Sequence, residues 1–250
     1  MGEPGRRVLL KHLSNAIRDH HIDVVVGNGE NAAGGFGITP DIAEELFDLG
    51  LSAITLGNHA WDKREAMEYL DKEPRVIRPA NYPDGVPGKG TCVIETNQGE
   101  RVGVLQLMGR VFMPMVDCPF RVAERELAQL TAKTDYIVVD MHAETTSEKM
   151  AMGYFLDGKV SAILGTHTHV QTADEQILPQ GTGYLTDVGM TGPVKSVIGM
   201  KSNLVIQKFL TQLPRRFEVA PGPSVLCGAV VQIDRATRKT THISRLRLFE

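Results

Sequence analysis

Four short apolar runs in the sequence each end in residues of the types that bind metal ions. The first run is followed by a glutamate and an asparagine, the second by an asparagine and a histidine, the third by a histidine and the fourth by a His-x-His pair. Because ligands of open α/β sheets bind at the carboxyl ends of the strands, these residues are expected to meet at one site. They are, in chain order, Glu30, Asn31, Asn58, His59, His142, His167 and His169.

This set of side chains predicts a metal centre. Neutral imidazoles, a carboxylate and amide oxygens suit first-row metals such as Mn, Fe or Zn, and one glutamate can bridge two ions. His167 and His169 are two residues apart, so on an extended segment they point the same way. Each motif has a plainer interpretation alone: Gly57-Asn58-His59 as a turn, and Glu30 in a solvated loop. Four such endings together favour the metal centre.

The elements that must position these residues follow an alternating strand and helix pattern, which predicts an α/β fold. Thr39 and Pro40 mark a helix start as N-cap and first helical residue, and Gly50 marks its end. A Gly-Glu-Pro-Gly turn is expected at residues 2–5, before a helix from Arg6. Strands are expected at 23–26, 53–56, 136–139, 160–164, 225–233 and 240–248, a hairpin at 91–94 and 102–107, and helices at 6–19, 40–50, 120–132, 147–156 and 204–210.

Composition narrows the class of protein. The chain has 250 residues and a formal net charge of −3, so it lacks the basic excess that tracks nucleic-acid phosphates, and DNA is not an expected partner. Its three cysteines are far apart in the sequence, which is typical of a reducing cytosol. No apolar run approaches the ~18 residues of a membrane span, and no signal peptide is recognisable. We expect one cytoplasmic domain over residues 1–250.

Longer motifs carry a resemblance to a known family. The stretches Gly-Glu-Asn-Ala-Ala-Gly-Gly at 29–35, Leu-Gly-Asn-His-Ala-Trp-Asp-Lys at 56–63, His-Ala-Glu-Thr-Thr-Ser-Glu-Lys at 142–149 and Gly-Thr-His-Thr-His-Val-Gln-Thr-Ala-Asp at 165–174 resemble the calcineurin-like metallophosphoesterase superfamily. Within it, the sequence is most similar to the bacterial YmdB-type 2′,3′-cyclic-nucleotide 2′-phosphodiesterases. The resemblance runs nearly end to end.

The resemblance implies a four-layer α/β/β/α sandwich around two metal ions, most often Fe or Mn, with Zn possible. Glu30 would bridge the ions, and Asn58, His142 and His167 would complete one metal site. His169 would serve the other site, with Asn31 at or near it. His59 would be the non-ligand catalytic histidine, acting as general acid or transition-state stabiliser. A cyclic nucleotide opened to a 3′-monophosphate is the implied reaction, and homo-oligomerisation is the implied assembly.

Two positions depart from the family pattern. The superfamily commonly has an acidic residue after the catalytic histidine, and here that residue is Ala60; Asp62 could orient His59 instead, or could pair with Glu65 as a helix capping box. Family members also begin with an apolar strand and Gly-Asp, whose aspartate would serve the His169 metal, whereas this sequence begins just after it. We expect an active dinuclear enzyme whose chain reaches further upstream; the alternative is a metal-binding regulator or scaffold with little catalysis.

Overall fold

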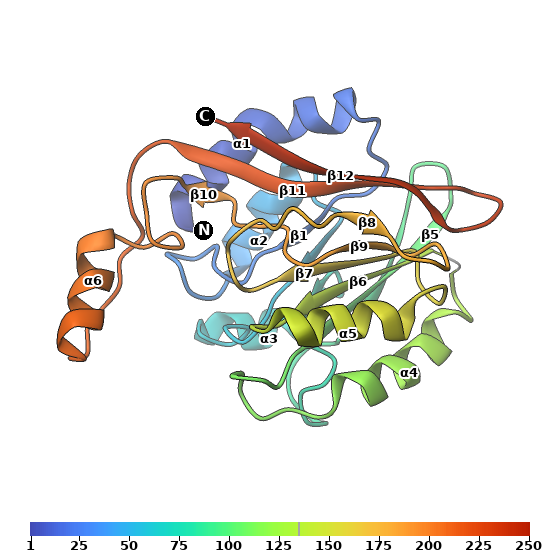
Figure 1. Ribbon diagram of the computed structural model, residues 1–250, viewed down its shortest axis with the longest axis horizontal. Coiled ribbons are helices and arrows are strands. Elements are labelled where there is room, and N and C mark those ends of the chain that lie inside the picture. Colours follow the sequence, from blue (N-terminus) through green and yellow to red (C-terminus); the bar gives the residue numbers. More distant parts are fainter. Residues whose placement is uncertain (135) are drawn as a thin grey trace.

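The computed structural model describes residues 1–134 and 136–250, which form three sheets and six helices (Figure 1). The largest sheet has the order β4-β5-β6-β7-β9-β8, and two three-stranded sheets have the orders β1-β2-β3 and β10-β11-β12. The strands are β1 (Val26–Asn28), β2 (Ala53–Thr55), β3 (Val76–Ile77), β4 (Thr91–Glu95), β5 (Arg101–Met108), β6 (Tyr136–His142), β7 (Ala162–Thr166), β8 (Gln176–Ile177), β9 (Gly183–Leu185), β10 (Gly192–Pro193), β11 (Ser224–Ile233) and β12 (Thr240–Phe249). The helices are α1 (Gly2–Asp19), α2 (Pro40–Asp48), α3 (Arg64–Lys72), α4 (Pro119–Leu130), α5 (Thr146–Leu156) and α6 (Ser202–Thr211).

Three apolar clusters hold these elements in four layers. One cluster joins α4 and α5 to the large sheet, through residues such as Leu127, Leu156 and Leu105. A second joins α1, α2 and α3 to β2. A third lies between the two strand layers and contains Ile77 and Val104. The layer order is therefore α/β/β/α, with α4 and α5 below the large sheet in Figure 1 and α1 and α2 on the opposite side. The predicted α/β fold class and its four-layer order are confirmed.

Local sequence signals account for several element boundaries. Thr39 Oγ1 accepts a hydrogen bond from the backbone N–H of Ile42 at 3.4 Å, and Pro40 is the first residue of α2. Gly50, with φ of 109°, follows the end of α2 in the left-handed region that favours glycine. The predicted hairpin is β4 paired antiparallel with β5.

Four local predictions are wrong. Residues 2–5 form the first turn of α1 rather than a separate turn, because Pro4 needs no N–H partner there and the Gly5 N–H donates to Met1 O at 3.1 Å. No side chain caps α3, so Asp62 and Glu65 form no capping box. The strands expected at 23–26 and 160–164 lie two or three residues further along, at 26–28 and 162–166, where they pair with their neighbours.

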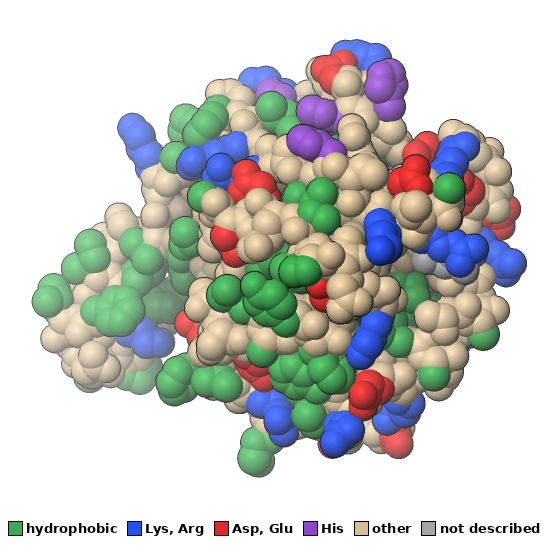
Figure 2. Space-filling view, turned by 45° about the vertical axis from the view of Figure 1, so that its right-hand side comes forward, with side chains coloured by type: hydrophobic (Ala, Val, Ile, Leu, Met, Phe, Trp, Pro, Cys, Tyr) green, Lys and Arg blue, Asp and Glu red, His purple; other side chains and the backbone are tan. Residues whose placement is uncertain are grey.

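Two surface features bear on the site and on assembly. A cavity of about 580 Å³ lies between β1 and β11; Glu30, Asn31, His167 and His169 are among its lining residues, together with apolar side chains of α1 and both strands. Helix α6 projects from the body in Figure 1, and hydrophobic side chains gather over it in Figure 2. Among the described residues, no helix is long and apolar enough to cross a membrane.

Candidate metal centre

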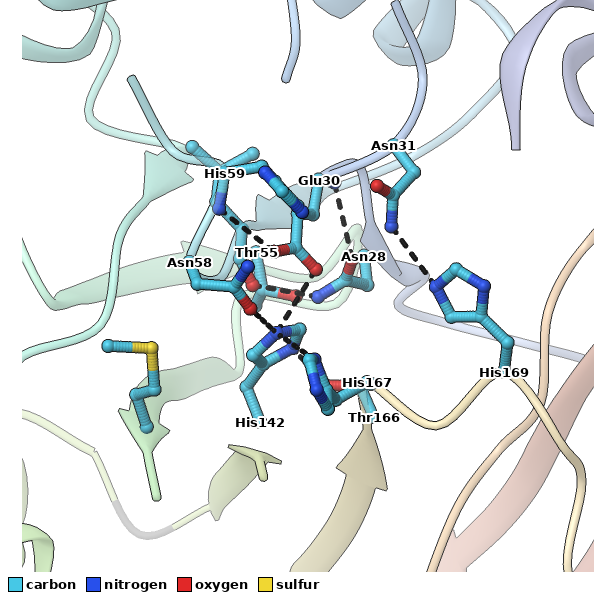
Figure 3. A network of polar contacts seen from close by, with 12 residues as sticks. Asn28, Glu30, Asn31, Thr55, Asn58, His59, His142, Thr166, His167 and His169 are labelled. Carbon is cyan, nitrogen blue, oxygen red and sulfur yellow. Dashed lines mark hydrogen bonds and ion pairs between the residues drawn. The ribbon is translucent and has the colours of Figure 1, made fainter. Parts of the chain in front are cut away.

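Parallel pairing brings the predicted residues to one edge of two facing sheets. In the large sheet, β6 and β7 run parallel with His142 opposite Thr166, so His167 follows directly beside His142. In the small sheet, β1 and β2 run parallel with Asn28 opposite Thr55, so Glu30 and Asn58 leave neighbouring strand ends. Figure 3 shows these side chains converging from both sheets.

Glu30, His142 and His167 form the core of the cluster. One ligand atom from each lies within 4.8 Å of the others, which is the spacing of side chains around one metal ion. Glu30 Oε2 and His167 Nδ1 each lie 3.1 Å from His142 Nε2. Asn58 Oδ1 is also 3.1 Å from that nitrogen. A carboxylate, two imidazoles and an amide oxygen therefore converge on one point.

Thr166 and Asp140 fix the orientation of the His142 ring. Thr166 Oγ1 donates to Asp140 Oδ1 at 2.6 Å, so at 2.9 Å it accepts from the Nδ1–H of His142. Nε2 is therefore the ring nitrogen that faces Glu30 and Asn58. Metal-bound histidines commonly use the same device, in which the second ring nitrogen donates to a fixed acceptor.

Asp140 joins the two sheets behind the cluster. Its Oδ2 accepts hydrogen bonds from Thr55 Oγ1 at 2.5 Å and Asn28 Nδ2 at 3.2 Å, both from the small sheet. Gln106 Nε2 of β5 lies 3.4 Å from the same oxygen. Burial raises the pKa of Asp140, against the opposing effects of His142 and of these hydrogen bonds. The carboxylate thus fixes the distance between the strand ends that carry the candidate ligands.

His167 is oriented by the carboxylate of Glu144, which lies just before α5. Its Nε2 lies 3.0 Å from Glu144 Oε2, which leaves Nδ1 to face His142. Burial lowers the pKa of His167 to about 4, and the nearby His142 acts in the same direction. At neutral pH the ring is therefore uncharged, as a metal ligand must be.

Electrostatics keep Glu30 ionised. Burial alone would raise its pKa, but the charge and hydrogen bond of His142 and the backbone N–H of His59 lower the pKa to about 2. For His142, burial alone would lower the pKa, whereas Glu30 raises it above the ordinary value. Without a metal ion, a proton between the two side chains holds the pair together. A cation that replaces this proton would meet the same ligand atoms.

His169 and Asn31 form a second, adjacent group. Asn31 Nδ2 lies 3.2 Å from His169 Nε2, and His169 Nδ1–H donates to Ile198 O at 2.9 Å. Burial lowers the pKa of His169, so this ring is also favoured in its neutral form. In Figure 3 the pair lies to the right of Glu30, whereas Asn58 lies to its left and His142 and His167 lie below it. Glu30 therefore stands between the two groups, where a bridging carboxylate would be needed.

The side chain of His59 lies outside the cluster, whereas its backbone N–H contacts Glu30. Its N–H donates to Glu30 Oε1 at 2.9 Å, while its Nδ1 lies 2.7 Å from Asp62 Oδ2. Of the two roles considered for Asp62, the structure has it contacting the histidine and not capping α3.

Gly57 is required by close packing at the centre. A Cβ at this position would lie 2.3 Å from His142 Nε2 and 2.7 Å from Glu30 Cδ, both well inside normal contact. The motif Gly57-Asn58-His59 therefore combines a small residue, a candidate ligand and a candidate catalytic residue in one turn.

All seven predicted residues lie together, but apart from Asp62 the sequence did not identify the side chains that orient them. Asp140 precedes His142 by two residues on the same strand, and Thr166 directly precedes His167; these spacings were the available signals. Glu144 precedes α5 and contacts His167, although it had no predicted role at this site. The donor set fits a first-row metal, because a carboxylate oxygen, two imidazole nitrogens and an amide oxygen converge beside buried supporting groups.

Comparison with known proteins agrees with this geometry. The profile of the YmdB-like protein family matches residues 1–246. The chain is 46% identical over 246 residues to a 2′,3′-cyclic-nucleotide 2′-phosphodiesterase of Bacillus subtilis (strain 168), covering 98% of this chain and 93% of that protein. A crystal structure of a hypothetical protein from Thermus thermophilus superposes with a TM-score of 0.94 and 44% identity, covering 100% of this chain and 96% of that one. A phosphatase from Mycoplasma pneumoniae superposes with a TM-score of 0.92 and 34% identity, over 99% and 90% of the two chains.

Proposed function

This chain belongs to the YmdB-like protein family, and from that premise we propose that it hydrolyses 2′,3′-cyclic nucleotides to 3′-monophosphates with two bound metal ions. In general terms, the protein is a hydrolase that acts on phosphoester bonds. Its substrate is accordingly a small phosphoester. Iron or manganese is the proposed metal, by analogy with the family and from the mixed nitrogen and oxygen donors.

One observation carries the proposal: Glu30 lies between two groups of donors. Asn58, His142 and His167 lie on one side of its carboxylate, and Asn31 and His169 on the other. Glu30 in this position would help to hold both ions. When bound, paired first-row metal ions neutralise charge that develops on a phosphoryl group and lower the pKa of water toward neutrality.

The chain's own residues then have separable roles. Glu30, held ionised, balances the positive charge of the centre, while Glu144 and Thr166 fix the rings of His167 and His142. His59 supplies the proton for the leaving 2′-oxygen or a hydrogen bond to a phosphoryl oxygen, because its side chain lies outside the donor cluster. Asp62 fixes the His59 ring through Nδ1, so that Nε2 remains to meet the substrate.

A regulatory or scaffold role with little catalysis is the second candidate. It is favoured by the fact that, among residues 1–134 and 136–250, one group of three or more His, Cys, Asp or Glu side chains could hold a metal, and this group lacks His169. Near His169 the side-chain partner is the amide of Asn31. A chain that binds one ion well and the other poorly would fit this second role.

Metal content and product analysis separate the two candidates. Protein stripped with a chelator is reloaded with Mn²⁺ or Fe²⁺, and bound metal is counted per chain. We expect close to two ions, and 2′,3′-cyclic AMP converted to the 3′-monophosphate as identified by ³¹P NMR. One ion per chain with no turnover would favour the regulatory role. Turnover that persists without any metal would overturn the proposed mechanism.

Self-association is proposed for α6. Ile206, Phe209 and Leu210 are between 52% and 79% exposed on this projecting helix, an apolar surface that a second copy could cover. Light scattering of the wild type should give a mass above that of one chain. The variant Phe209→Glu should lower that mass, and an unchanged monomer in both proteins would refute the proposal.

A further inference from the structure

The segment that carries His167 and His169 has an unusual backbone. His167 has a φ of 98° and His169 a φ of 65°, both in the left-handed region that side chains with a Cβ rarely adopt. Such conformations are energetically unfavourable and persist only where the surroundings fix them. The surrounding fold must therefore hold this segment in place. Thr168 is its middle residue, between the two histidines.

Asp187 is the group that holds Thr168. Its Oδ2 accepts the Thr168 backbone N–H at 3.1 Å and the Thr168 hydroxyl at 2.7 Å. The other oxygen accepts the Gly189 N–H at 2.8 Å. Asp187 thus binds the residue between the histidines through two separate donors, and its own position is fixed by a third.

Lys149 anchors this carboxylate from α5. Its Nζ lies 2.8 Å from Asp187 Oδ2, and both side chains are only 1% exposed. The backbone at Thr186 lies so close to β7 that a Cβ on Gly165 would lie 1.7 Å from Thr186 O. The pair therefore links a helix, the segment after β9 and the histidine segment in one buried unit.

Burial argues against stability alone as the role of this pair. Removing two charges from water is energetically costly, and well-packed neutral replacements are often equally stable. The pair is better explained by its geometric effect. Thr168 is the only residue between His167 and His169, so fixing it sets the direction of both imidazoles.

We propose that Lys149 and Asp187 are positioning residues that act through Thr168 to fix His167 and His169 relative to one another. The inference rests on the proposed metal centre, where these histidines serve two different ions. The buried pair would thereby fix where both proposed metal positions lie relative to Glu30.

Two changes test the unit without leaving a lone buried charge. Thr168→Val removes one donor to Asp187, and Thr168→Ser restores the hydroxyl. Lys149→Met with Asp187→Asn removes both charges together and keeps similar volumes. The matched control is Thr131→Val, because Thr131 makes a comparable hydroxyl bond to Leu127 O at the end of α4, away from the site.

The first readout needs no metal. Imidazole ¹⁵N spectra of the metal-free full chain should show shifted signals for His167 and His169 in Thr168→Val and in the double variant. Thr168→Ser and Thr131→Val should keep the wild-type signals. Unchanged histidine signals in folded Thr168→Val and in the folded double variant would overturn the positioning role.

The second readout is Mn²⁺ affinity by equilibrium dialysis. Loss of supporting contacts behind metal ligands typically weakens binding roughly 10–100-fold, and we expect a loss of this size in both test variants with recovery in Thr168→Ser. Wild-type affinity in Thr168→Val and the double variant would refute the inference. A wild type that binds no Mn²⁺ would instead refute the proposed function, and the spectra would still decide the positioning role.

Discussion

Asp62 Oδ2 lies 2.7 Å from His59 Nδ1, three residues further along the same loop. The contact supplies the acidic partner that Ala60, directly after the histidine, does not. The orienting carboxylate here comes from Asp62, two residues after Ala60, because the loop turns back toward the imidazole. Because Asp62 contacts the His59 side chain, changing Asp62 tests the catalytic proposal for His59 separately from the metal-binding proposal for the neighbouring residues.

His59→Ala is expected to lower kcat by roughly 10²- to 10⁴-fold, the usual contribution of a general acid. Metal content should stay at the wild-type value, because the alanine keeps the backbone N–H that donates to Glu30 Oε1. Steady-state kinetics with 2′,3′-cyclic AMP and metal analysis of the same sample provide the check. Turnover at the wild-type rate would remove His59 from the mechanism.

Asp62→Asn is expected to lower kcat on the order of 10- to 100-fold while leaving KM nearly unchanged, because the ring of His59 loses its charged partner. Glu65→Gln is the matched control: it is the residue that a capping box would need, and α3 has no side-chain cap. Equal kinetics for the two variants would argue that Asp62 has no role in orienting His59.

Gly57→Ala is expected to weaken Mn²⁺ binding at least about tenfold, because the added methyl must displace His142 or the Glu30 carboxylate. Gly228→Ala is the control, since no heavy atom lies within 4 Å of its added Cβ. Dialysis against Mn²⁺ measures both affinities. Identical Mn²⁺ affinities of the two variants would show that the side chains around Gly57 are packed less closely than the contacts above imply.

Metal binding is expected to release a proton near neutral pH. Burial lowers the pKa of His142, but Glu30 outweighs it and raises the pKa above the ordinary value, so the metal-free pair retains a proton that a cation must displace. Apparent affinity should therefore rise with pH until the pKa of His142 is passed. Titration calorimetry in two buffers of different ionisation enthalpy should give different heats. Equal heats in both buffers would contradict the expected release.

The sequence patterns located the candidate residues at one edge of the fold, but they did not reveal most of the side chains that support those residues. Strand ends are visible as apolar runs followed by polar residues, so Glu30 and His142 could be placed at one edge before any coordinates. Glu144 and Asp187 gave no such signal, because their partners His167 and Thr168 are distant in sequence and meet them only through packing. Strand boundaries shifted for the same reason: pairing with β2, rather than local composition, sets where β1 begins.

The bridge between the two sheets at Asp140 has a kinetic consequence. Its hydrogen bonds to Asn28 and Thr55 span 112 and 85 residues of chain, and the contact of Asn31 with His169 spans 138. Closing such long loops is entropically costly, and contacts of this kind slow folding. The donor cluster is therefore expected to assemble late on the folding path. An ion bound there would then act mainly by slowing unfolding. The rate at which the ion dissociates would measure how often the two sheets separate.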